Sequence, residues 1–170
     1  MAMFKEVADI KTADMLNLPV PEVEYHNIAV KPSQVQKEMV ASLGERAEKI
    51  RGGGIDSSVD NMLKVTNDGR KLALDQRMMN PMLPDEEGSK VNACVNEVYR
   101  IWEENSDKKL TQLLFCDLST PKGAGEFSVY TDIRKKLIER GIPESEIKFI
   151  HEADTETKKQ ELFKKVRRGE

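Results

Sequence analysis

The strongest constraint on the fold lies in the last third of the chain, residues 111–170, where short apolar runs alternate with amphipathic stretches. Residues 113–116 form one apolar run, and residues 147–150 supply another behind the turn residues Gly141 and Pro143. Short continuous apolar runs are typical of strands that are buried on both faces of a parallel sheet. The pattern therefore predicts two buried strands in this part of the chain.

Each expected strand is followed by an amphipathic helix. Between the strands, apolar side chains fall on one face of a 3.6-residue helix, at Phe127, Tyr130, Ile133, Leu137 and Ile138. A smaller stripe of Leu162, Phe163 and Val166 follows the second strand. A strand, crossover helix and strand of this length close right-handed into a parallel pair. We therefore expect an α/β fold, a small parallel sheet flanked by helices, which stops where a third strand would follow.

Ligands of open α/β sheets bind at the loops after the carboxyl ends of the strands. Here those loops are residues 119–123 and 151–154. The Gly123-Ala124-Gly125 segment is similar to part of a phosphate-binding loop, but it also suits a chain that must turn into a helix near Glu126. The two loops are the predicted ligand-binding edge.

The preceding half of the chain is predicted to be mainly helical. Residues 33–36 (SQVQ) form a capping box, from which a helix extends to the glycines at 52–54. Residues 23–30 are expected to form a strand, and residues 67–69 (NDG) a turn. Ser89 opens a further helix, whose inward face carries Val91, Val95, Val98 and Trp102.

Composition limits the classes of function. A net charge of −3 and a pI near 5.6 argue against overall attraction to nucleic acid, so any such attraction needs a local patch. The absence of a signal peptide or a membrane-length apolar stretch favours a cytoplasmic protein without a membrane partner. Cys94 and Cys116 lack a CxxC spacing and are expected to be reduced core thiols. No catalytic residue and no metal site are predicted from spacing.

Two parts of the chain resemble a known family. Residues 112–123 (QLLFCDLSTPKG) and 130–170, which include EIKFIHEADTETKKQELFKKVRRGE, are similar to the C-terminal RecA-like lobe of superfamily II helicases. The similarity is to the Swi/Snf-related group of phages and conjugative elements. Residues 60–71 (DNMLKVTNDGRK) and 73–77 (ALDQR) resemble the segment ahead of that lobe.

The resemblance implies three regions. Residues 1–20 would be an N-terminal helical linker, and residues 21–85 a strand–helix and connecting segment ahead of the lobe. Residues 86–170 would be an incomplete lobe that contains the motif IV region, at 113–117, and is cut before motif V. The expected function is thus a fragment of a DNA-dependent ATPase or helicase, the second motor lobe, which contacts the nucleic-acid backbone.

The resemblance also implies a set of DNA-binding residues. Ser119, Thr120 and Lys122 lie in the loop that approaches the nucleic-acid backbone in such helicases. His151 stands where many relatives have a His-Gly pair, although Glu152 replaces the glycine here. Lys158 and Lys159 of the final helix would add positive charge.

No GxxxxGK[ST] phosphate loop occurs in the chain, and the arginine-bearing motif VI would lie beyond Glu170. The resemblance therefore implies that this chain binds no cofactor and does not hydrolyse ATP alone. ATP and Mg²⁺ would bind to the intact parent, and the N-terminal ATPase lobe of that parent would be a partner besides DNA.

Two alternatives stay open. The basic residues of the final helix fit a phosphate-contacting patch, but they also fit a solvated helix face with cations near its C-terminus. His151 likewise fits a phosphate contact or a structural role. The chain as a whole fits either the helicase fragment or a stand-alone α/β protein-interaction module without nucleic-acid activity. An open sheet edge would in addition permit a homodimer.

Overall fold

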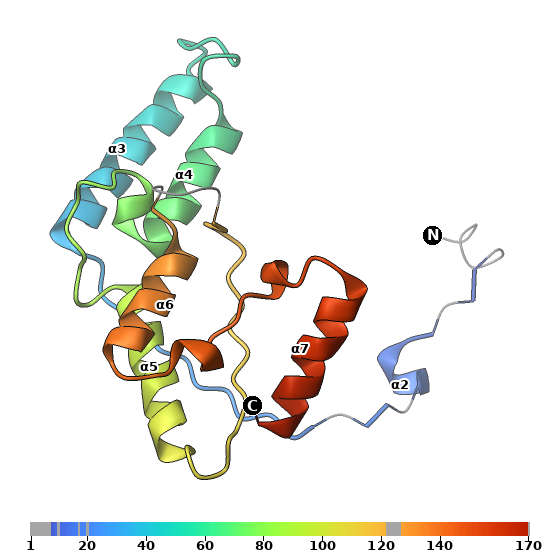
Figure 1. Ribbon diagram of the computed structural model, residues 1–170. Helices are drawn as coiled ribbons and strands as arrows, with labels where there is room; N and C mark the ends of the chain where they lie inside the picture. Colours follow the sequence, from blue (N-terminus) through green and yellow to red (C-terminus); the bar gives the residue numbers. More distant parts are fainter. Residues whose placement is uncertain (1–7, 10, 17, 20, 122–126, 170) are drawn as a thin grey trace.

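The computed structural model describes residues 8–9, 11–16, 18–19, 21–121 and 127–169 (Figure 1). Its α-helices are α2 (Ala13–Leu16), α3 (Gln34–Arg51), α4 (Met62–Leu74), α5 (Lys90–Glu104), α6 (Val129–Glu139) and α7 (Glu156–Arg168). Single 3₁₀ turns are formed by η1 (Gln76–Met78), η2 (Glu144–Glu146) and η3 (Ile150–Glu152). No helix in these ranges is long and apolar enough to cross a membrane.

The predicted parallel sheet is wrong, because the described ranges contain helices and turns but no β-strand. The first apolar run is irregular and the second leads into η3, and the two runs pack against different helices and do not pair with each other. Gln112, beside the first run, donates a hydrogen bond to the Val98 carbonyl of α5 at 2.9 Å. Phe149, in the second run, packs edge-on against Tyr130 of α6, with ring centroids 5.5 Å apart. The fold class is therefore helical, and the expected RecA-like lobe is not formed.

The strand expected at residues 23–30 is also absent. This stretch is irregular, and its large apolar side chains are exposed, with Tyr25 84% exposed. A strand gains its stability from a neighbouring strand and a buried face. Because these residues have neither, their β-type composition does not produce a strand.

α3 and α4 form a helical hairpin (Figure 1). The predicted capping box is confirmed, since the Ser33 hydroxyl and the Gln36 side chain each accept the other residue's backbone N–H at 3.0 Å. The predicted turn at residues 67–69 is wrong, because these residues lie inside α4. Across the hairpin, Arg46 donates hydrogen bonds to Asp60 and Asp68. The Asp68 carboxylate, inside α4, is therefore paired with Arg46 of α3.

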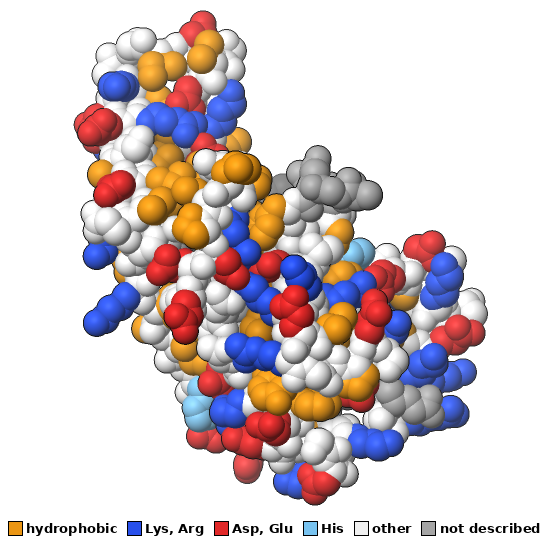
Figure 2. Space-filling model, turned by 60° about the vertical axis from the view of Figure 1, so that its left-hand side comes forward, with side chains coloured by type: hydrophobic (Ala, Val, Ile, Leu, Met, Phe, Trp, Pro, Cys, Tyr) orange, Lys and Arg blue, Asp and Glu red, His pale blue; other side chains and the backbone are white. Residues whose placement is uncertain are grey.

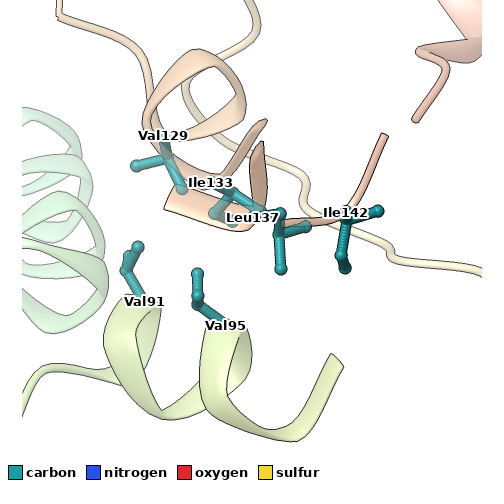
Figure 3. Close-up of a cluster of buried hydrophobic side chains, with 6 residues drawn as sticks. All are labelled: Val91, Val95, Val129, Ile133, Leu137 and Ile142. Atoms are coloured by element: carbon teal, nitrogen blue, oxygen red, sulfur yellow. The ribbon is translucent and has the colours of Figure 1, made fainter. Parts of the chain in front are cut away.

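α5 and α6 enclose the hydrophobic core (Figure 3). The Val91 and Val95 side chains of α5 point toward three residues of α6, and Ile142 closes one end. Those α6 residues are Val129, Ile133 and Leu137. The apolar stripe predicted for α5 is thus confirmed. That predicted for α6 is confirmed at Ile133 and Leu137, but Ile138 is exposed, and the buried Val129 was not predicted. Ser89 caps α5 as expected, because its hydroxyl accepts the Asn92 N–H at 3.1 Å.

None of the residues of α7 is buried, and none belongs to the core cluster. The N-terminus of α7 is capped by Thr155, and its C-terminus ends at Gly169, which has a φ of +69°. A Cβ atom at Gly169 would lie 2.8 Å from the Lys109 Cβ, so the end of α7 rests directly on the segment that follows α5. This segment, residues 109–118, runs between α5 and α7 in Figure 1.

Candidate nucleic-acid interface

Ser119 caps the N-terminus of α6 although it lies nine residues before the N-cap position, Ser128. Its Oγ accepts the Val129 N–H at 2.9 Å, and its carbonyl accepts the Ser128 hydroxyl at 2.7 Å. The N-cap residue, Ser128, makes no capping bond with its own side chain. Ser119 has a φ of +63°, a left-handed conformation that is uncommon for a residue with a Cβ. Two hydrogen bonds to α6 therefore hold the predicted loop at the start of this helix.

The other residues predicted for this loop differ in position. Thr120 is exposed, and Pro121 is half-buried. Lys122 lies outside the described residues, so its predicted role stays untested by the structure. Thr120 directly follows Ser119, whose hydroxyl bonds to the N-terminus of α6, and the dipole of a helix favours an anion at that end.

His151 is held against the same end of α6 by an aromatic cluster. Its ring stacks on Phe149, with centroids 5.3 Å apart and planes 18° apart, and it meets Tyr130 edge-on at 5.6 Å. Burial raises the pKa of the Tyr130 hydroxyl, as do Cys116 and Asp117 nearby. The protonated hydroxyl donates to the Cys116 carbonyl at 2.5 Å. The two predicted loops therefore converge on the first turn of α6, although no sheet brings them there.

Arg134 and Glu152 fasten the His151 turn to α6. The Arg134 guanidinium lies 3.6 Å from the centroid of the Phe149 ring and donates a hydrogen bond to Glu152 at 2.8 Å. Burial alone would raise the pKa of Glu152, but Arg134 outweighs this effect and the pKa is lowered. The Arg134 Nε is buried and has no hydrogen-bond partner within the described ranges. Glu152 thus forms an ion pair that joins the His151 turn to α6.

The basic residues of α7 differ in their contacts. Lys158 pairs with Asp154 at 2.7 Å, and Lys159 is half-buried, so neither is a fully free cation. Lys164 and Arg167 are exposed, form no ion pair with the described part of the chain, and lie on the face opposite Leu162 and Val166. Figure 2 shows Lys and Arg side chains gathered over α7 on the right-hand part of the surface in view.

Lys109 extends this basic surface, and sequence reasoning did not find it. It follows α5, is exposed, and contacts Gly169 at the end of α7. Because 60 residues separate Lys109 from Gly169, periodicity within one helix carries no signal for their contact. We call the surface formed by Lys109 with Lys164, Lys165, Arg167 and Arg168 the α7 basic surface.

A buried ionic network joins the α3–α4 hairpin to the α5–α6 pair. Arg77 donates to Asp75 at 2.7 Å and to Asp132 at 2.8 Å, and it lies 3.2 Å from an Asp85 oxygen. Lys136 lies 2.6 Å from Asp85 and 2.8 Å from Asp132. The Asp75 side chain is 2% exposed and that of Arg77 10%. The network was not predicted, because its members come from three separate segments, residues 75–77, Asp85 and α6.

We expect this network to make stability depend on acid pH. Burial alone would raise the pKa of Asp132, but hydrogen bonds from Arg77 and Lys136 outweigh it, so the pKa is lowered. A carboxylate with a lowered folded-state pKa stabilises the fold fully above its unfolded pKa, about 3.9, and loses that contribution as pH falls through the folded pKa. The melting temperature should therefore fall below about pH 4.

The matched measurement is the thermal unfolding of the wild-type chain and of Asp132→Asn from neutral to strongly acidic pH. Asp132→Asn should be less stable at neutral pH, and its deficit should shrink in acid, because the wild-type carboxylate is then protonated as well. A deficit of constant size over the whole range would show that the charge of Asp132 does not stabilise the fold.

Neither a metal site nor a known relative identifies this surface. Among the residues that the structure describes, no three His, Cys, Asp or Glu side chains are grouped so that they could hold a metal ion. Cys94 and Cys116 are free, half-buried thiols, and burial, followed by the nearby Cys116, raises the pKa of Cys94. No protein-family model, curated protein or solved structure matches the chain. The interpretation therefore depends on the residues themselves.

Proposed function

We propose that this chain is part of a cytoplasmic DNA-dependent ATPase or helicase and supplies a surface that contacts the nucleic-acid backbone. The resemblance of residues 60–77 and 130–170 to Swi/Snf-related helicases supports this proposal. On the same proposal, ATP and Mg²⁺ bind to another part of the parent enzyme, its N-terminal ATPase portion. Because the chain has no phosphate loop, its own contribution is to hold DNA.

The observation that carries the proposal is the charge of α7, the helix that supplies most of the α7 basic surface. α7 has six Lys or Arg residues and two Glu residues, a net charge of +4, in a chain whose net charge is −3. Clustered cations bind nucleic acid by neutralising phosphates and releasing counterions, and this mechanism does not need base contacts. The α7 basic surface therefore fits a DNA backbone better than it fits a base-reading role.

We expect duplex DNA to bind weakly, with an affinity that falls steeply as salt increases. Replacing Lys164, Lys165 and Arg167 with glutamine should lower the slope of log affinity against log salt by about 2–3, since each phosphate contact contributes about 0.9. Fluorescence anisotropy with a labelled duplex over a salt series measures this slope.

The matched control replaces Lys31, Lys37 and Lys49 with glutamine. These lysines are also exposed, and the change in net charge is the same, but they lie on and before α3. An unchanged slope in the α7 variant, or an equal loss in the control, would place the DNA contact elsewhere. The absence of DNA binding at any salt concentration would favour the second candidate, a protein-interaction module.

One observation favours that second candidate. Leu113 is 76% exposed and Phe115 is 89% exposed, on a segment that lies between two helices. Adjacent exposed apolar side chains are typical of surfaces that bind other proteins. The binding of a protein at this segment and of DNA at the α7 basic surface are compatible.

A further inference from the structure

Residues 110–116 (LTQLLFC) form an extended segment whose backbone groups have no hydrogen-bond partner among the described residues except at Cys116, whose carbonyl accepts the Tyr130 hydroxyl. No backbone–backbone hydrogen bond joins residues 109–121 to another described residue. The segment lies between α5 and α7 (Figure 1), and its large apolar side chains are half or more exposed along most of its length. A row of free N–H and C=O groups beside apolar side chains is the form in which a chain accepts an additional β-strand.

The side chains of this segment alternate only in part, because Leu110 and Leu114, which strict alternation would bury, are 59% and 49% exposed. Gln112 and Cys116 are half-buried on the α5 side, where Gln112 bonds to Val98 and Cys116 packs against the core. Thr111, Leu113 and Phe115 are all exposed on the other side. Thr111, Leu113 and Phe115 are two positions apart, so in an extended chain they share one face.

The segment is also held in place before any partner arrives. Lys109 contacts Gly169 at one end, and the Cys116 carbonyl accepts the Tyr130 hydroxyl at the other. Binding to a preformed strand costs less conformational entropy than binding to a mobile one. Because no sheet forms, the open sheet edge expected from the sequence is absent. This single extended segment can nevertheless pair with another strand.

We propose that residues 110–116 pair with the same residues of a second copy of this chain, in an antiparallel ribbon centred on Leu113. The charges that flank the segment argue for this partner. Residues 110–116 are uncharged, whereas Lys109 precedes them and Asp117 follows them. In the antiparallel register centred on Leu113, Lys109 of each copy lies opposite Asp117 of the other, and opposite charges across a strand pair are stabilising.

The other cross-strand neighbours are compatible with this register. Leu113 faces its own equivalent on the two-fold axis, and Phe115 faces Thr111, so the exposed apolar face of each copy meets the other. Asp117 already accepts a hydrogen bond from Arg70, but its side chain is 76% exposed, which leaves room for a lysine. A parallel pairing in register would instead place Lys109 beside Lys109 and Asp117 beside Asp117.

The first test is the concentration dependence of mass for the full chain, by sedimentation velocity. The interface is short, so we expect a weak, reversible monomer–dimer equilibrium. Leu113→Lys places two like charges on the two-fold axis and should weaken dimerisation roughly tenfold or more. The matched control is Leu63→Lys on α4, which is 71% exposed and should leave the dimer unchanged. Because Leu113 and Leu63 are both exposed, each variant should fold, which circular dichroism verifies.

The second test examines the register by charge exchange. Lys109→Asp alone and Asp117→Lys alone each place like charges at both ends of the ribbon and should weaken the dimer. An equimolar mixture of the two variants restores opposite charges at both ends, so heterodimers should form.

A wild-type chain that stays monomeric at every concentration would overturn the proposal. A different protein would then be the candidate partner for residues 110–116. A dimer that is insensitive to Leu113→Lys would place the interface elsewhere. Failure of the mixture to restore dimers would overturn the antiparallel register. Growth beyond dimers, unaffected by the charge changes, would indicate non-specific apolar aggregation instead.

Discussion

Replacing Arg77 with methionine is expected to destabilise the folded chain by about 3–5 kcal/mol, because removing one partner of a buried ion pair leaves an uncompensated buried charge. Asp75 is 2% exposed, and Arg77 is the cation that binds it. Asp132 keeps Lys136 as a partner after the substitution, so the main cost arises at Asp75. Methionine preserves most of the side-chain volume, which separates the loss of charge from the loss of packing.

The measurement is urea unfolding followed by the fluorescence of Trp102, the single tryptophan of the chain, which packs against the core. Arg100→Met is the matched control. Arg100 pairs with Glu97 and Glu104, but it is 51% exposed, and exposed ion pairs contribute about 0–1 kcal/mol. Similar losses for the two variants would show that the network around Arg77 contributes no more than a surface ion pair.

Replacing Leu137 with alanine is expected to cost about 2–5 kcal/mol of unfolding free energy, the range for a buried leucine that leaves a cavity. Leu137 is 5% exposed and lies in the cluster shared by α5 and α6 (Figure 3). Few other large side chains are fully buried in the described ranges, so the core has little capacity to compensate. The loss should therefore be a large part of the total stability of 5–15 kcal/mol that is typical of a domain.

The control for this substitution is Leu63→Ala on α4. Leu63 is 71% exposed, and both positions lie within helices, so the change in helix propensity is similar in the two variants. We expect Leu63→Ala to change the stability by no more than about 0.5 kcal/mol. Equal effects at the two positions would mean that the α5–α6 cluster is not the principal core.

The helices are the part of the fold that sequence patterns predicted well. The capping box at Ser33, the cap at Ser89 and the stripe that contains Val91 and Val95 all depend on residues within four positions of one another. Such local patterns fix a helix start and its buried face without reference to the rest of the chain. The loops at Ser119 and His151 both lie at the first turn of α6, but no sheet edge brings them together, and their role as a binding site stays a prediction.

The patterns that failed are those whose outcome depends on distant partners. The run at residues 113–116 is as apolar as a buried strand, but apolarity does not specify which segment will pair with it. The NDG sequence at residues 67–69 favours a turn in isolation, and it is helical here where Arg46 of the neighbouring helix binds Asp68. In both cases tertiary contacts override a local preference.

Sequence alone determined where α3 and α5 begin, which face of α5 is apolar, and that residues 156–168 are strongly basic in an acidic chain. Only the tertiary structure decided that no sheet forms in the described ranges, that Lys109 joins the α7 basic surface, and that Arg77 lies buried among three carboxylates. The physical reason is the separation in sequence over which each interaction acts. Helix caps and hydrophobic periodicity involve residues a few positions apart, whereas strand pairing and buried ion networks join segments that meet only after folding.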